Sequence, residues 1–184
     1  MDEIKQALIE AGVLTETEGH LILAKPEALY TESAKPQLEF IANELVRQFA
    51  EEGVRTVVAM EKKRVLAHAV TKALNNLTKD LKGSKAVAAC TVLAEKRPGQ
   101  FKVLIQNHWQ SGIKDQTVLI VHDFLMNPLE MLMIQELVEA VINGGGNPRV
   151  LCVIAGGDRR FGEIFRMSTQ HAYQLLDHRD LAMK

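Results

Sequence analysis

The sequence predicts an α/β fold in which a mainly parallel central sheet is flanked by helices. Short apolar runs rich in β-branched residues alternate along the chain with amphipathic stretches that have helical spacing. Strands that are apolar throughout are typical of a parallel sheet whose two faces are covered by its crossover helices. No internal repeat or long linker interrupts this pattern in the 184 residues, so we expect one domain, residues 1–184.

The N-terminal third is predicted to contain two helices with a strand and a loop between them. The expected order is helix 2–11, strand 21–24, loop 25–36 and helix 37–52. The first helix stops at Gly12 and the second at Gly53, a residue type that commonly ends helices. The loop is predicted from Pro26 and Pro36, because proline interrupts regular structure. It is expected to include a short extended piece.

The rest of the chain alternates strands with helices. The predicted strands are 55–60, 85–94, 100–105, 117–123 and 149–157, and the predicted helices are 65–77 and 127–144. Three glycines, 144–146, are expected to end the second of these helices and turn the chain into the last strand. They are better explained by this turn than by a phosphate-binding turn, because a strand follows them and a helix does not.

Composition narrows the classes of function. The chain is 47% hydrophobic and 24% charged, with a formal net charge of −1, so neither nucleic acid nor an anionic membrane is expected as a partner. No apolar run approaches the roughly 20 residues that a membrane span needs, and the acidic start does not resemble a signal peptide. We expect a cytoplasmic protein. Cys90 and Cys152 each lie in an apolar run and are expected to be buried, reduced thiols.

Ligands of a parallel sheet bind beyond the carboxyl ends of the strands. Four segments follow such ends: 60–64, 94–99, 122–130 and 156–162. If the protein has a small-molecule site, these segments form it.

The start of the helix at 127 predicts its own cap. Asn127 is a favoured N-cap, Pro128 fits the first helical position, and Glu130 completes a capping box of the N-x-x-E type. In many α/β proteins a glycine-rich turn binds phosphate at such a junction, but here no glycine occurs between Val118 and Asn143. The cap uses backbone N–H groups, and Glu130 would repel an anion. We therefore predict that this helix start is closed to phosphate.

Four segments together resemble the type I phosphoribosyltransferases, and orotate phosphoribosyltransferase in particular. IKQALIEAGVLTETEGHLILA (4–24) resembles that family's N-terminal helix and hood strand, and LAEKRPGQFKVLIQNHW (93–109) its mobile catalytic loop and hairpin. TVLIVHDFLMNPLE (117–130) aligns with the signature V-L-V-V-[DE]-D-V-x-T-T-G-G-[ST], and CVIAGGDRRFGEIF (152–165) resembles the V-D-R segment with the phrase after it.

This resemblance implies the type I phosphoribosyltransferase fold. The expected features are a mainly parallel sheet, a small hood formed by roughly 1–35 and 160–184, and a protruding hairpin. It also implies a homodimer. A nucleotide, a nucleobase or a phosphosugar is the expected class of ligand.

The resemblance also implies roles for particular residues. The candidate catalytic residues are Asp123, Lys96 and His122. In the family, two adjacent acids hold the ribose hydroxyls of phosphoribosyl pyrophosphate (PRPP). Asp123 matches the second acid, His122 stands at the first, and Lys96 matches the mobile-loop lysine.

Further positions match the family's phosphate and pyrophosphate contacts. They are Lys62, Lys63, Phe124, Asn127, Glu130 and Arg159. No metal ligand and no cofactor is predicted from the residues themselves. Mg²⁺ is expected only if transferase activity is retained.

The sequence departs from the family pattern at these same positions. His122 removes one negative charge, and 126–130 replaces the T-T-G-G-[ST] turn. The segment 60–63 lacks the glycines of the pyrophosphate loop, and the hood phrase at 25–30 retains only Tyr30. From the residues alone, His122 is more typical of a strand-end histidine hydrogen-bonded to a neighbour than of a switch or metal ligand. Asp123 is equally compatible with a remnant ligand and with a polar residue at the strand exit. The charge run at 62–64 is more typical of a solvated helix start than of an anion site.

Three functions therefore remain open. The first is a protein that has lost transferase chemistry and acts as a binding, regulatory or scaffold homodimer. The second is an active phosphoribosyltransferase with an unusual phosphate site that uses Lys62, Lys63 and Arg159. The third is binding of a nucleotide or nucleobase without turnover.

Overall fold

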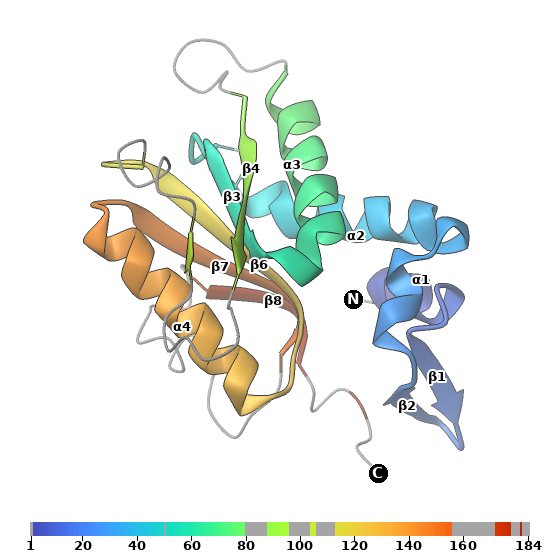
Figure 1. The fold of residues 1–184 in the computed structure, drawn as a ribbon. Helices are drawn as coiled ribbons and strands as arrows, with labels where there is room; N and C mark the ends of the chain where they lie inside the picture. Colours follow the sequence, from blue (N-terminus) through green and yellow to red (C-terminus); the bar gives the residue numbers. More distant parts are fainter. Residues whose placement is uncertain are drawn as a thin grey trace.

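The computed structural model describes residues 2–49, 51–79, 88–95, 104–105, 113–155, 172–177 and 181. Within these residues a six-stranded central sheet has the order β5-β4-β3-β6-β7-β8 (Figure 1). Its strands are β3 (Thr56–Met60), β4 (Cys90–Glu95), β5 (Leu104–Ile105), β6 (Thr117–Leu125), β7 (Asn147–Ala155) and β8 (Ala172–Asp177). All neighbours pair in parallel except β4 and β5, which are antiparallel. The predicted fold class is confirmed.

Helices cover both faces of this sheet. Helices α2 (Lys35–Val46) and α3 (Arg64–Thr78) lie on one face and α4 (Pro128–Asn143) on the other (Figure 1). Because side chains alternate along a strand, Val57 and Ala59 of β3 pack into one apolar cluster with α2 and α3. Val58 and Met60 pack into a second cluster with α4. Burial on both faces explains why β3 carries the consecutive apolar residues 57–60 and no alternation with polar ones.

The N-terminal segment forms the hood. It contains α1 (Asp2–Glu10), the antiparallel hairpin of β1 (Leu14–Thr17) and β2 (His20–Leu23), and the 3₁₀ helices η1 (Pro26–Tyr30) and η2 (Glu32–Ala34). The hairpin turns at Glu18 and Gly19, which both have positive φ. Leu8, Leu14 and Leu29 of the hood are buried in the same cluster as α2 and α3, so the hood shares the core of the domain.

Several element boundaries differ from the prediction. The expected loop 25–36 is helical, because η1 and η2 run directly into α2 at Lys35; proline is compatible with a first helical turn, where its missing N–H is not needed. Helix α2 ends at Val46 and is continued by the 3₁₀ helix η3 (Arg47–Phe49), so the predicted end at 52 was too late. Strand β1 was not predicted, because its sequence, LTET, has a single apolar residue.

The C-terminal prediction also needs a correction. Residues 172–177, expected in the hood, pair in parallel with β7 as strand β8 of the central sheet. The prediction of two buried cysteines was half right. Cys152 is buried in β7, but Cys90 is exposed because it is the first residue of β4, where the strand enters the sheet.

The glycine run after α4 forms the turn that the sequence predicts. Gly144 caps α4, and Gly145 has a φ of 78°, a backbone conformation that glycine adopts readily.

No helix in the described parts of the chain is long and apolar enough to cross a bilayer.

Candidate functional site

The carboxyl ends of β3 and β6 bring a lysine onto a buried aspartate. After β3 the chain forms the 3₁₀ helix η4 (Glu61–Lys63), and Lys63 is the N-cap residue of α3. Its Nζ lies 2.8 Å from Asp123 Oδ1 and 2.9 Å from Oδ2. The Asp123 side chain is 1% exposed and that of Lys63 is 21% exposed. The lysine therefore extends from the protein surface to a carboxylate that is not accessible to solvent.

Strand β6 continues past the predicted strand exit. It ends at Leu125, two residues beyond the predicted end at 123, so His122 and Asp123 lie within the strand. Both are buried, at 1% exposure each. The sequence placed these residues at the strand exit, but they are buried positions inside the strand. The pairing of β6 with β7 likewise extends to Leu125↔Ala155.

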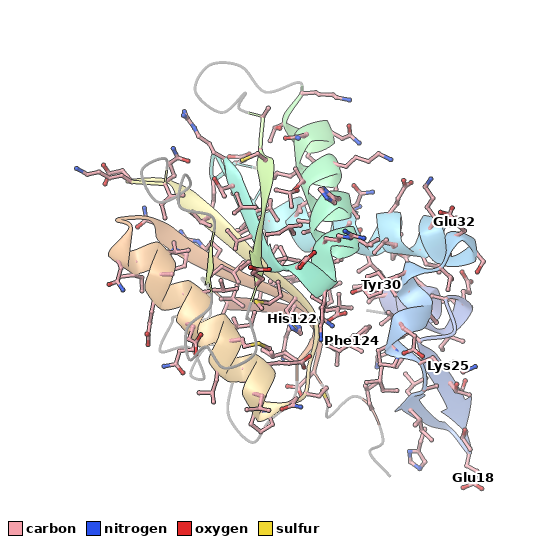
Figure 2. All side chains as sticks on the ribbon, in the orientation of Figure 1. Glu18, Lys25, Tyr30, Glu32, His122 and Phe124 are labelled. Carbon is pink, nitrogen blue, oxygen red and sulfur yellow. The ribbon has the colours of Figure 1, made fainter. Side chains whose placement is uncertain are left out.

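Asp123 also receives hydrogen bonds from the hood and from its own strand. The phenol of Tyr30, at the end of η1, donates to Oδ2 at 2.5 Å, and the backbone N–H of Phe124 donates to Oδ1 at 2.7 Å. Figure 2 shows Tyr30 where the hood meets the end of β6, close to His122 and Phe124. An ionised carboxylate has about four lone-pair positions. Tyr30, Phe124 and the two contacts of Lys63 supply four donor contacts.

The carboxylate is held in its ionised form. Burial by itself would raise the pKa of Asp123, but His122, the Lys63 ammonium and the hydrogen bonds from Lys63 and Tyr30 lower it below its ordinary value. Burial, and next the charge of Asp123, raise the pKa of the Tyr30 phenol. Tyr30 is therefore a permanent donor and Asp123 a permanent acceptor at neutral pH.

His122 is buried as a neutral imidazole. Burial, with a smaller contribution from Lys63, lowers its pKa to about 4, although Asp123 acts in the opposite direction. Its Nδ1 lies 3.2 Å from Asp123 Oδ1, a separation that would suit an ion pair, but at neutral pH the ring carries no charge to make one. Among the described residues Nδ1 has no hydrogen-bond partner. Its Nε2 lies 4.0 Å from Glu130 Oε1.

A buried thiol lies on the neighbouring strand. Cys152 of β7 donates to the backbone oxygen of Asp123 at 3.1 Å and to that of Ile154 at 3.0 Å. Burial and the charge of Asp123 raise the pKa of the thiol above its ordinary value. Cys152 therefore remains a neutral packing residue.

The start of α4 is capped by its own side chain, as predicted. Asn127 has extended backbone angles, and its Oδ1 accepts from the backbone N–H of Leu129 at 2.8 Å. Pro128 occupies the first turn, and Met131 N donates to Asn127 O at 3.1 Å. The second half of the predicted capping box differs, because the Glu130 carboxylate lies toward His122. Burial raises the pKa of Glu130, with Asp123 adding to the effect and Lys63 and Lys62 opposing it.

The structure brings together most of the predicted site residues. Those that meet at the ends of β3 and β6 are His122, Asp123, Phe124, Glu130 and Lys63. Asn127 caps the adjoining helix, and Lys62 is exposed on η4. Lys96 and Arg159 lie outside the described residues.

Tyr30 and Cys152 were absent from the predicted site. In the sequence, Tyr30 stands out only as the retained residue of the hood phrase, and Cys152 is one position of an apolar strand. Nothing local marks either of them, because both reach Asp123 across a long sequence separation.

The donor set at the strand ends does not fit the Mg²⁺ that an active transferase of this fold would use. Mg²⁺ requires oxygen ligands at near-octahedral positions, whereas the Asp123 oxygens already accept from Lys63, Tyr30 and the Phe124 backbone. No group of three or more His, Cys, Asp or Glu side chains suited to a metal occurs in the described parts of the chain.

Comparison with known proteins identifies the fold. Orotate phosphoribosyltransferase from Aeropyrum pernix matches 96% of this chain over 94% of its own, at 12% identity and a TM-score of 0.62. The adenine phosphoribosyltransferase of Giardia lamblia, complexed with 9-deazaadenine, covers 95% of this chain and 97% of its own chain. The sequence identity is 11% and the TM-score is 0.63. Orotate phosphoribosyltransferase of Mycobacterium tuberculosis, in complex with inorganic phosphate, covers 98% of this chain and 91% of its own chain. The sequence identity is 14% and the TM-score is 0.57.

Sequence comparisons add no relative to these structures. No protein-family model matches the chain, and no curated protein matches it. The structural matches span nearly the whole length on both sides. This chain therefore has the fold of the type I phosphoribosyltransferases.

Proposed function

We propose that the protein does not carry out PRPP-dependent transfer and acts as a binding, regulatory or scaffold homodimer. The observation that carries the proposal is the closed carboxylate of Asp123. In the family that the sequence resembles, the matching acid binds ribose hydroxyls. In this chain four donor contacts already occupy the carboxylate.

A ribose would have to displace these donors to bind Asp123. Tyr30 and Lys63 come from separate elements, the hood and η4, and both end on a side chain that is 1% exposed. Displacing either would leave a buried charge with fewer partners, which costs free energy. The cluster therefore stabilises the fold and disfavours a substrate.

The start of α4 supports the same conclusion. A phosphate at a helix N-terminus binds free backbone N–H groups, but Asn127 Oδ1 occupies that of Leu129 and Pro128 has none. Glu130 adds a carboxylate in the first turn, where it would repel an anion. Both determinants of PRPP binding, the hydroxyl acceptor and the phosphate cradle, are thus altered in one protein.

An active transferase is the second candidate. It is favoured by the position of Asp123, which is ionised at the end of β6, with Lys62 and Lys63 at the carboxyl end of β3. Under this alternative the lysines would bind the phosphates and the hood would open to free the carboxylate. Orotate and adenine are the bases to test, because the similar structures are orotate and adenine phosphoribosyltransferases.

A direct assay separates the two candidates. PRPP, Mg²⁺ and either orotate or adenine would be incubated with the protein, and pyrophosphate and nucleotide measured together. We expect neither product, and we expect no saturable heat in a calorimetric titration with PRPP and Mg²⁺. Nucleotide formation that disappears in Asp123→Asn would establish the transferase and overturn the proposal.

Two further measurements define the binding role. A thermal-shift panel of nucleotides, nucleobases and phosphosugars tests for a ligand, since a ligand at 100 times its Kd adds about 2.7 kcal/mol of stability. Light scattering tests the homodimer, for which we expect a mass near twice the 20.5 kDa of one chain. A monomer at every concentration would contradict that part of the proposal.

A further inference from the structure

We propose that Lys63 is a resident cation of the Asp123 cluster, so that the cluster does not bind a divalent metal while Lys63 is present. The inference rests on the same closed carboxylate that supports the proposed function. Its test, however, measures metal binding and thermal stability, so its failure is distinguishable from a failure of the proposed function.

The contacts of Lys63 are those of a bound cation. Its Nζ is nearly equidistant from the two oxygens of Asp123, at 2.8 and 2.9 Å. A cation that bridges both oxygens of one carboxylate occupies this position. The ammonium also neutralises the single charge of a side chain that is 1% exposed, which removes the electrostatic reason to recruit an ion from solution.

The backbone tethers this cation. Lys63 is the last residue of η4 and the N-cap residue of α3, a helix of 15 residues. Its ammonium is therefore presented to Asp123 at a high effective concentration, because binding is intramolecular. A divalent ion would have to displace the tethered ammonium and lose hydration, which Mg²⁺ does reluctantly.

The neighbours of Asp123 show what removal of the lysine would expose. His122 Nδ1 lies 3.2 Å from Asp123 Oδ1 and has no hydrogen-bond partner among the described residues. Glu130 approaches the other ring nitrogen at 4.0 Å. The uncompensated carboxylate is the ligand type that suits Mn²⁺, and the neutral imidazole beside it is a ligand type of first-row transition metals. Loss of the Lys63 charge should therefore convert the cluster into a weak metal site.

The experiment compares Lys63→Met with the wild-type protein. Lys63→Met keeps the aliphatic stem and removes the charge, whereas Lys63→Arg keeps a cation. Lys62→Met is the matched control, because Lys62 is the adjacent residue of the same 3₁₀ helix, is exposed, and its removal changes net charge equally. Mn²⁺ binding would be followed by electron paramagnetic resonance at neutral pH. Melting temperature would be measured in Mn²⁺ and in NaCl of matched ionic strength.

We expect saturable Mn²⁺ binding and a rise in melting temperature of about 2–4 °C in Lys63→Met alone. The gain should disappear when Asp123→Asn is added. Tyr30→Phe distinguishes the loss of a positive charge from the loss of a hydrogen-bond donor. It frees one acceptor position of Asp123 but keeps Lys63, so we expect no gain of Mn²⁺ binding.

Every outcome decides the inference. If Lys63→Met is unfolded without metal, folding on addition of Mn²⁺ counts as the expected gain. No gain in Lys63→Met, whether it is folded or unfolded, contradicts the inference. So does a saturable Mn²⁺ site in the wild-type protein that Asp123→Asn abolishes. Transferase activity of the wild-type protein would contradict the proposed function without changing either readout.

Discussion

Tyr30 and Asp123 are 93 positions apart in the sequence and share a hydrogen bond of 2.5 Å from the phenol O–H to Oδ2. This bond joins the hood to strand β6 at the edge of the sheet where ligands of this fold class bind. Because the phenol stays protonated and the carboxylate stays ionised, the bond persists across the neutral pH range. It makes the hood part of the same polar cluster as Lys63.

Removing the phenol oxygen should destabilise the domain. For Tyr30→Phe we expect a loss of roughly 1.5–3 kcal/mol, the range for a hydrogen bond to a charged group, measured by urea unfolding. Tyr173, the only other tyrosine, lies half-buried on β8, and Tyr173→Phe is the matched control. Equal effects of the two substitutions would show that the bond to Asp123 contributes nothing specific.

The Lys63–Asp123 pair should show strong energetic coupling. Breaking a buried pair by removing one partner costs about 3–5 kcal/mol because a charge is left buried. The Lys63 side chain is 21% exposed, so we expect the stability loss of Lys63→Met to lie at the low end of this range. The double variant Lys63→Met/Asp123→Asn leaves neither charge. We expect it to be more stable than the sum of the single losses predicts, by at least about 1 kcal/mol. Additive losses in a double-mutant cycle would contradict the coupling.

Acidification should destabilise the protein through His122. Its folded pKa is lowered to about 4, so the unfolded chain binds this proton more readily. The free energy of unfolding is therefore at its plateau above pH ~6.5, the unfolded value, and falls between ~6.5 and ~4. The total loss is on the order of 3 kcal/mol. Asp123, whose pKa is also lowered, adds a further loss as the pH drops below its unfolded value of about 3.9.

Replacement of the histidine tests this assignment. In His122→Asn the slope of stability against pH between ~6.5 and ~4 should flatten, whereas His68→Gln, a change at an exposed position of α3, should leave it unchanged. A slope that survives in His122→Asn would show that another group is responsible.

The cap of α4 should contribute measurably to stability. Asn127→Ala removes the acceptor for Leu129 N, and we expect a loss of about 0.5–2 kcal/mol by chemical denaturation. Asn143→Ala, at the exposed last residue of the same helix, controls for the change of residue type and should alter stability by a few tenths of a kcal/mol at most. Equal losses would mean that the cap is energetically silent.

The central elements could be predicted because their signals are local. Strands β3, β6 and β7 contain the consecutive apolar runs 57–60, 118–121 and 150–155, and α3 and α4 repeat apolar residues at helical spacing. The Asn127 cap was predictable for the same reason, since a cap involves neighbours in the sequence. The boundaries around Pro26 and Pro36 were missed because proline is compatible with both a loop and a first helical turn.

The amino-acid sequence by itself determined the α/β class, the parallel core strands, the self-capped start of α4 and the clustering of polar residues at one sheet edge. Each of these depends on periodicity or on contacts within a few positions. Only the tertiary structure decided that Lys63 and Tyr30 fill the acceptors of Asp123, that His122 is buried without charge, and that 172–177 joins the sheet. Those outcomes depend on burial and on pairing between distant segments, which local sequence patterns do not encode.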